Sequence, residues 1–241
     1  MELLGDLSWL AIGQIILIDL LLGGDNAIVI ALACRNLPES HRLRGILWGT
    51  VGAIGARMLL LTFAYTILQI SFVKLIGGIL LYWIALKLLA ETDDEQEDIH
   101  ASDRLLTAIK TIVIADVVMS IDNVIAVSGA AQHAGGNNQL LLMIFGISVS
   151  VPIIVWGSTF VLRLINTFPF IVVGGSAMLG YIAGAMAFAD NVVLPVVKNQ
   201  FAFLDATMYL LNVKLSVPGF IAALSIIIIA AFNWHQSKNN T

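Results

Sequence analysis

Two short acidic motifs interrupt strongly apolar sequence, and they constrain the fold of this chain more than any other feature. The first lies between Ile18 and Ala31, which is apolar apart from Asp19, Asp25 and Asn26. The second repeats the same three polar residues 97 positions later, as Asp116, Asp122 and Asn123. A carboxylate at the centre of a membrane helix costs about 2.5–3.5 kcal/mol, so two copies of one acidic motif predict a functional site.

The apolar content of the chain favours a membrane as its surroundings. Of its 241 residues, 59% are hydrophobic and only 12% are charged, and the mean hydropathy is +0.94. Soluble domains carry roughly 25% charged residues, and several windows here exceed the ~20 apolar residues that cross a bilayer. The sequence therefore predicts a polytopic protein whose main partner is the lipid bilayer. No basic stripe suggests nucleic acid, and no nucleophile–base pair or nucleotide loop suggests an enzyme.

The distribution of apolar residues predicts an all-α fold with seven membrane spans in one transmembrane domain, residues 1–241. The acidic stretch at 91–105 has too few apolar residues to be buried, and we interpret it as a solvated cytoplasmic linker. The spans are predicted near residues 8–33, 44–68, 73–90, 106–131, 138–165, 168–189 and 213–233.

The 97-residue offset extends beyond the acidic motifs. Gly49 matches Gly146, and the Gly77-Gly78 pair matches Gly174-Gly175. Residues 8–90 and 106–189 are therefore predicted to be two copies of one three-helix unit. Because three is an odd number of spans, the copies must insert with opposite orientations, which is the inverted-repeat plan of secondary transporters. The span at 213–233 is an extra C-terminal helix.

Basic residues predict the orientation in the membrane. With the N-terminus outside and the C-terminus in the cytoplasm, most of them fall on the cytoplasmic side, as the positive-inside rule requires. The inner ends and loops then hold Arg35, Arg42, Arg44, Lys87, Arg104, Lys110, Arg163 and Lys238, against Lys74, Lys198 and Lys214 outside.

The spacing within each motif limits how it can bind an ion. In an unbroken helix, Asp19 and Asn26 share nearly one face but lie about 10.5 Å apart along the axis, too far to hold one ion. Gly23-Gly24 is a place where the helix can unwind and turn Asp25 and Asn26 inward. An inverted two-fold axis would bring the Asp-Asn pairs of both motifs together. The candidate ligands are Asp19, Asp25, Asn26, Asp116, Asp122 and Asn123.

Carboxylate and amide oxygens suit hard divalent cations such as Mn²⁺, Mg²⁺ or Ca²⁺, here as transported substrate and not as a resident cofactor. The four histidines fall in loops or at helix ends, which disfavours zinc or copper. Arg57 is the only basic residue deep in apolar sequence, and a structural salt bridge to one aspartate is slightly favoured over a direct part in transport. Since one base cannot neutralise four acids, a cation or proton pathway is predicted. The glycine pairs and Gly180-x-x-x-Gly184 are predicted to permit close helix packing.

The paired Asp-x5-Asp-Asn motifs, at Asp19/Asp25/Asn26 and Asp116/Asp122/Asn123, resemble those of the TerC family of integral membrane proteins, and the short form is similar to its YjbE-type branch. The resemblance runs from about residue 8 to 233. It implies the three-plus-three helix repeats of the LysE-type transporters, with the matching acidic and Asn positions binding metal. Several family members are associated with manganese efflux and with supplying metal to exported proteins.

Together these features predict a bacterial inner-membrane exporter of a divalent cation, with Mn²⁺ favoured, that works by alternating access. Exchange for protons would follow naturally from such a site, though the sequence does not demand it. The Asp-Asn pairs would bind the ion, with Asp19 and Asp116 as further ligands or proton carriers. One alternative is a non-transporting membrane factor in tellurite resistance or metal supply to exported proteins. Another is an exporter of small organic solutes, against which four buried acids argue. The protein-export machinery and a second copy of the chain are left open as partners.

Overall fold

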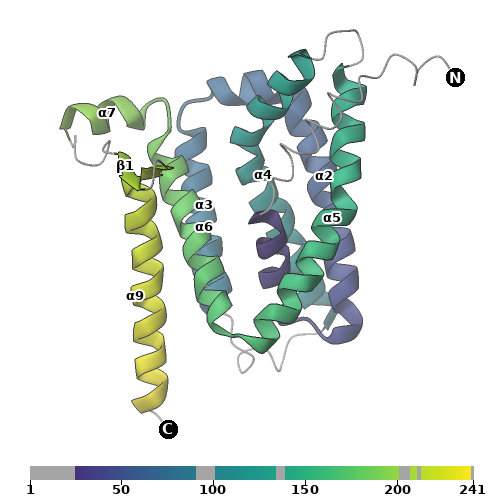
Figure 1. Cartoon of the computed structure of the whole chain (residues 1–241), viewed down its shortest axis with the longest axis vertical. Coiled ribbons are helices and arrows are strands. Elements are labelled where there is room, and N and C mark those ends of the chain that lie inside the picture. Colours follow the sequence, from purple (N-terminus) through teal and green to yellow (C-terminus); the bar gives the residue numbers. More distant parts are fainter. Residues whose placement is uncertain (1–24, 91–100, 134–138, 201–206, 211–212, 240–241) are drawn as a thin grey trace, which may run out of the picture. The chain divides into compact units, whose positions relative to one another are not determined.

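The computed structural model describes residues 25–90, 101–133, 139–200, 207–210 and 213–239 (Figure 1). The chain divides into two compact units, one of residues 1–67 and 98–164, the other of residues 68–97 and 165–241. Each unit thus combines segments from both halves of the sequence, and each is described by itself.

The first unit contains the acidic motifs. Its described helices are Asp25–Cys34, most of α2 (Glu39–Gln69), α4 (Ala101–His133) and most of α5 (Gln139–Thr167). α2 and α4 approach closely at Gly49, where a Cβ atom would press against the side chain of Ile112. A Cβ on Gly157 of α5 would likewise lie within contact distance of Ala27. Small residues at these crossings let the helix backbones come together.

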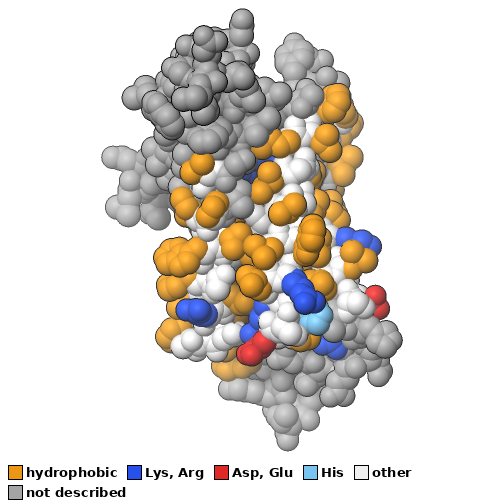
Figure 2. All heavy atoms as spheres, turned by 90° about the vertical axis from the view of Figure 1, so that its right-hand side faces the viewer, with side chains coloured by type: hydrophobic (Ala, Val, Ile, Leu, Met, Phe, Trp, Pro, Cys, Tyr) orange, Lys and Arg blue, Asp and Glu red, His pale blue; other side chains and the backbone are white. Residues whose placement is uncertain are grey.

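Large apolar side chains are exposed along the outer faces of this unit. In α2 they include Trp48, Leu59 and Phe63, and in α5 Trp156 and Phe160, each with 55% or more of its surface exposed. Figure 2 shows apolar side chains spread over one face, with most of the charged side chains in view gathered in its lower part. Such broad apolar surface is costly in water and is what a lipid-facing surface requires.

The second unit contains α3 (Val73–Ala90), α6 (Phe170–Phe188), α7 (Val193–Gln200), strands β1 (Thr207–Leu210) and β2 (Val213–Ser216), and α9 (Val217–Asn239). α6 packs against both α3 and α9, and Figure 1 shows the three helices side by side. The antiparallel strands pair Thr207 with Ser216 and Leu210 with Val213.

Glycines set the helix spacing in this unit. A Cβ on Gly78 of α3 would lie 2.6 Å from the carbonyl oxygen of Ala183, and one on Gly184 of α6 would lie 2.6 Å from that of Pro218. The prediction of close packing is confirmed at these positions. It is wrong for Gly174, which is exposed and whose added Cβ would meet none of the described residues within 4 Å.

A side chain from a distant part of the sequence caps α3. Asp190, which follows α6, accepts hydrogen bonds through Oδ2 from the backbone N–H groups of Lys74 and Leu75, at 3.1 and 3.4 Å. Its Oδ1 accepts one from Val192 at 2.9 Å. Phe72, with a φ of 64°, has no side-chain oxygen to cap the helix that follows it, so Asp190 supplies the carboxylate that first-turn amides favour.

The observed helices agree with the predicted membrane spans at most positions and differ from them at a few. Within the described residues a helix lies at each predicted span, and four are long and apolar enough to cross a membrane: Glu39–Leu60, Val73–Ala90, Phe170–Phe188 and Val217–Trp234. The all-α prediction is confirmed for these helices, but it missed α7 and the β1–β2 hairpin, which extends to residue 216, where the last span was expected to have begun. Five residues of the predicted linker, 101–105, belong to α4.

Candidate functional site

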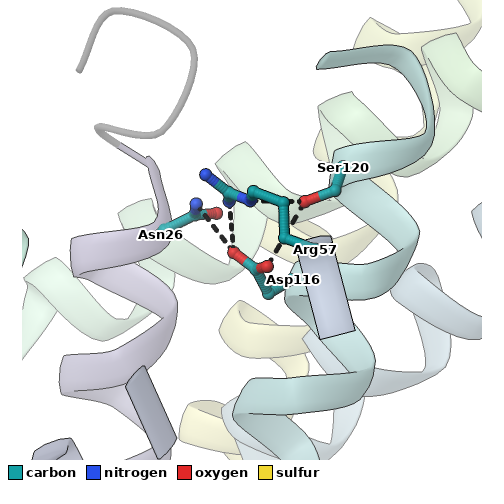
Figure 3. A network of polar contacts seen from close by, with 4 residues as sticks. All are labelled: Asn26, Arg57, Asp116 and Ser120. Carbon is teal, nitrogen blue, oxygen red and sulfur yellow. Dashed lines mark hydrogen bonds and ion pairs between the residues drawn. The ribbon is translucent and has the colours of Figure 1, made fainter. Parts of the chain in front are cut away.

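Asp116 is the centre of a buried polar network in the first unit. Its carboxylate meets side chains from three helices: Asn26 from the Asp25–Cys34 helix, Arg57 from α2, and Ser120 from α4 itself (Figure 3). Asn26 Nδ2 donates to Asp116 Oδ1 at 3.0 Å, and Ser120 Oγ donates to Asp116 Oδ2 at 3.3 Å. The two oxygens of the carboxylate therefore accept hydrogen bonds from different side chains.

Arg57 is the cation of this network. Its Nη2 lies 2.5 Å from Asp116 Oδ1, and its Nε donates to Ser120 Oγ at 2.9 Å. The planar guanidinium therefore contacts an acid and a hydroxyl that stand one helical turn apart on α4. The prediction of a salt bridge between Arg57 and a motif aspartate is confirmed.

The local sequence explains why α4 can present both groups. The helix runs unbroken through Asp116, Met119 and Ser120, and residues four apart in a helix lie on one face. Ser120 was not among the predicted ligands, and its four-residue spacing from Asp116 was the signal that could have placed it in the site.

Burial makes the pairing energetically important. The exposed fractions of Asp116, Arg57, Asn26 and Ser120 are 7%, 6%, 4% and 0%. An ion removed from water costs several kcal/mol, which only good geometry and further hydrogen bonds can offset. The Asp116 carboxylate accepts hydrogen bonds from Asn26, Arg57 and Ser120, which offset part of this cost.

Two oxygens beside the network have no such partner. Asp25 Oδ1 and Asn26 Oδ1 are buried atoms that accept no hydrogen bond from the described part of the chain. Asp25 also lies within electrostatic reach of both Asp116 and Arg57. Buried acceptors without donors are uncommon, and a cation is the kind of ligand that would satisfy a carboxylate and an amide oxygen together.

The structure describes only some of the predicted ligands. It brings Asn26 of the first motif to Asp116 of the second, with Asp25 next to Asn26 in the chain. Asp19 and the Gly23-Gly24 pair lie outside the described residues. Within the residues that the structure describes, no three His, Cys, Asp or Glu side chains form a group able to hold a metal. Two further predicted ligands lie on α4 but their side chains are not described: Asp122 and Asn123.

Comparisons with known proteins agree with the resemblance seen in the motifs. The model of the integral membrane protein TerC family matches residues 4–238. The uncharacterized membrane protein YjbE of Bacillus subtilis is 42% identical over 72% of this chain and 77% of its own length. The inner membrane protein YgdQ of Escherichia coli strain K12 is 27% identical over 63% of this chain and 68% of its own. No solved structure shows significant similarity to the chain.

Proposed function

Since this chain belongs to the TerC family of integral membrane proteins, we propose that it is a transporter that exports a divalent metal cation, with Mn²⁺ the favoured ion. Alternating access carries the ion across the membrane, with exchange for protons as a natural coupling. By analogy with the inner membrane protein YgdQ, its place is the bacterial inner membrane. The basic residues favour the N-terminus outside and the C-terminus in the cytoplasm.

One observation carries this proposal: the buried meeting of Asn26 and Asp116, which come from the two copies of the acidic motif. Helices otherwise covered with apolar side chains do not hold buried acids without a functional reason. The adjacent Asp25 and Asn26 oxygens, which accept no hydrogen bond from described residues, add hard ligands to the same place. Mn²⁺ and Mg²⁺ share this oxygen preference, and the family's association with manganese favours the former.

The duplicated sequence supports a mechanism as well as a site. In an inverted-repeat transporter, the ion binds where the two copies meet, and one copy moves relative to the other. Each copy here contributes to the network, since Asn26 and Arg57 precede the linker and Asp116 and Ser120 follow it. The sequence repeat supplies the remaining ligands of this proposed site, which are Asp19, Asp122 and Asn123.

The proposal is tested by metal flux into proteoliposomes. Wild type should move Mn²⁺, and Asp116→Asn and the double variant Asp25→Asn/Asp122→Asn should each lose that flux while staying folded. Asp103→Asn is the matched control, because it makes the same substitution at an exposed position in the first turn of α4. Mg²⁺, Ca²⁺ and an amino acid are run in parallel to define the substrate. Absence of flux for every metal in wild type would refute the exporter.

The ion pair itself favours a second candidate function. Because Arg57 already neutralises Asp116, the network could serve only to hold helices together in a non-transporting membrane factor, one that assists tellurite resistance or metal supply to exported proteins. That candidate predicts normal function in cells for Asp25→Asn, since Asp25 takes no part in the ion pair. Loss of metal flux in the same variant would rule it out.

A further inference from the structure

Arg57 is paired with Asp116, the acid that a transported ion would need as a ligand. Asp116 Oδ1 accepts hydrogen bonds from Arg57 Nη2 and Asn26 Nδ2, while Oδ2 accepts one from Ser120. A metal ion cannot approach the same oxygen while the guanidinium holds it, because two cations at such distance in a poorly solvated interior repel strongly. Metal and Arg57 must therefore alternate at Asp116.

The rest of the site presents the opposite situation. Asp25 Oδ1 and Asn26 Oδ1 are buried and accept nothing from the described residues, although Asn26 donates to Asp116 through its other atom, Nδ2. Within the polar cluster, the carboxylate of Asp116 is thus neutralised by Arg57, whereas one oxygen each of Asp25 and Asn26 accepts no hydrogen bond from the described residues. This is the arrangement expected of a cation site whose strongest ligand is covered from within.

The internal repeat argues that Arg57 is not simply required by the fold. At the 97-residue offset, the position that matches Arg57 is Ile154 in α5, and Ile154 is a buried apolar residue, 9% exposed. The same helix position in the other copy is therefore filled without charge. A salt bridge needed merely to pack this helix would be expected in both copies.

We propose, on the basis of the transport function above, that Arg57 is a tethered counter-cation that competes with the transported metal for Asp116. With no metal bound, the guanidinium neutralises the carboxylate of Asp116, so this acid is not left as a bare negative charge in the empty carrier. When metal arrives, it takes Asp116, and Arg57 withdraws along its flexible side chain. The residue thereby sets metal affinity and lets the carrier return without cargo.

The test is Mn²⁺ binding to purified protein in nanodiscs, for wild type, Arg57→Gln and Arg57→Lys. Removal of the competing charge in Arg57→Gln should tighten Mn²⁺ binding by about tenfold or more, whereas Arg57→Lys keeps the charge and should stay within roughly threefold of wild type. Asp116→Asn should lose binding. Ile154→Leu, a volume-conserving change at the matching position of the other copy, serves as the control and should bind like wild type.

The outcomes separate this inference from the proposed function. If wild type binds Mn²⁺ and Asp116→Asn does not, but Arg57→Gln binds equally or more weakly, Arg57 is structural and the exporter stands. If neither wild type nor Arg57→Gln binds any of Mn²⁺, Mg²⁺ and Ca²⁺, both ideas fail. Should Arg57→Gln prove unstable, its melting temperature with and without Mn²⁺ decides: competition predicts a larger rise on adding metal than in wild type, and a smaller or equal rise overturns it.

Discussion

The Arg57–Asp116 ion pair allows the energetics of the buried network to be measured directly. The perturbation is a double-mutant cycle with Arg57→Met, Asp116→Leu and the combination of both. Both replacements remove charge without leaving a cavity, since methionine is close to arginine in volume and leucine is larger than aspartate. The cycle therefore reports on the interaction and not on the creation of a cavity.

The structure gives the expected magnitudes. Arg57→Met leaves a carboxylate that is 7% exposed and keeps the neutral donors Asn26 and Ser120, and loss of one partner of a buried pair costs ~3–5 kcal/mol. Asp116→Leu strands the guanidinium and should cost a similar amount. The double variant buries no unpaired charge and loses the hydrogen bonds that Asn26 and Ser120 make with the pair, a cost of ~1–2 kcal/mol. The combined change should therefore destabilise less than either single one.

The assay is unfolding in mixed detergent micelles, followed by circular dichroism, with the free energy of unfolding compared across the cycle. A neutral pair, Tyr82 and Ser225, provides the control cycle: their hydroxyl oxygens lie 2.6 Å apart in the second unit, so Tyr82→Phe with Ser225→Ala should show coupling of only ~1 kcal/mol. Additive costs at Arg57 and Asp116, or single costs below ~1 kcal/mol, would refute the view that the carboxylate is ionised and dependent on Arg57.

Three further predictions concern other positions. Gly184→Ala should destabilise the protein by ~1–3 kcal/mol, because the new Cβ meets backbone of α9, and Gly174→Ala should be neutral; thermal unfolding of both variants checks this. Burial works to raise the pKa of Asp190, but its backbone N–H donors lower the pKa below the ordinary value. The stabilisation that Asp190 gives is therefore complete above pH ~4 and is lost as the pH falls toward the lowered pKa. Unfolding measured from pH 7 to pH 3 should show this loss in wild type but not in Asp190→Asn. Asp25→Asn should abolish Mn²⁺ flux with no loss of thermal stability, since Asp25 Oδ1 accepts no hydrogen bond from described residues; a large drop in melting temperature would instead make Asp25 structural.

How much of this could be predicted from sequence depends on the kind of interaction. Membrane helices follow from apolar length alone, so α3 (Val73–Ala90) ends where the hydropathy pattern ends. The hairpin at 207–216 was missed because its pairing depends on two short segments finding each other, with no long apolar run to reveal them. The cap that Asp190 places on α3 is likewise a contact between segments far apart in the chain, which local patterns do not report.

The candidate site shows the same division. Polar residues in apolar sequence were sufficient to single out Asn26, Asp116 and Arg57, which meet in one buried network, because an unsatisfied polar group in lipid is too costly to persist. Their partners were not predictable in the same way. Spacing did not indicate that Asn26 would bond to Asp116, because which faces of separate helices meet is decided by packing across the unit.

The discontinuous make-up of the second unit has a consequence for how the chain is made. α3 leaves the ribosome well before α6 and α9, yet the close neighbours of Gly78 lie on α6 and the carboxylate that caps Lys74 and Leu75 belongs to Asp190. Membrane helices that are inserted early must therefore remain in the bilayer without their packing partners until the later helices are inserted. A nascent chain released before Asp190 would lack both the cap and the packing partner of α3. Such a chain would present an unfinished helix to membrane proteases, so the last-made segments determine whether the first-made ones survive.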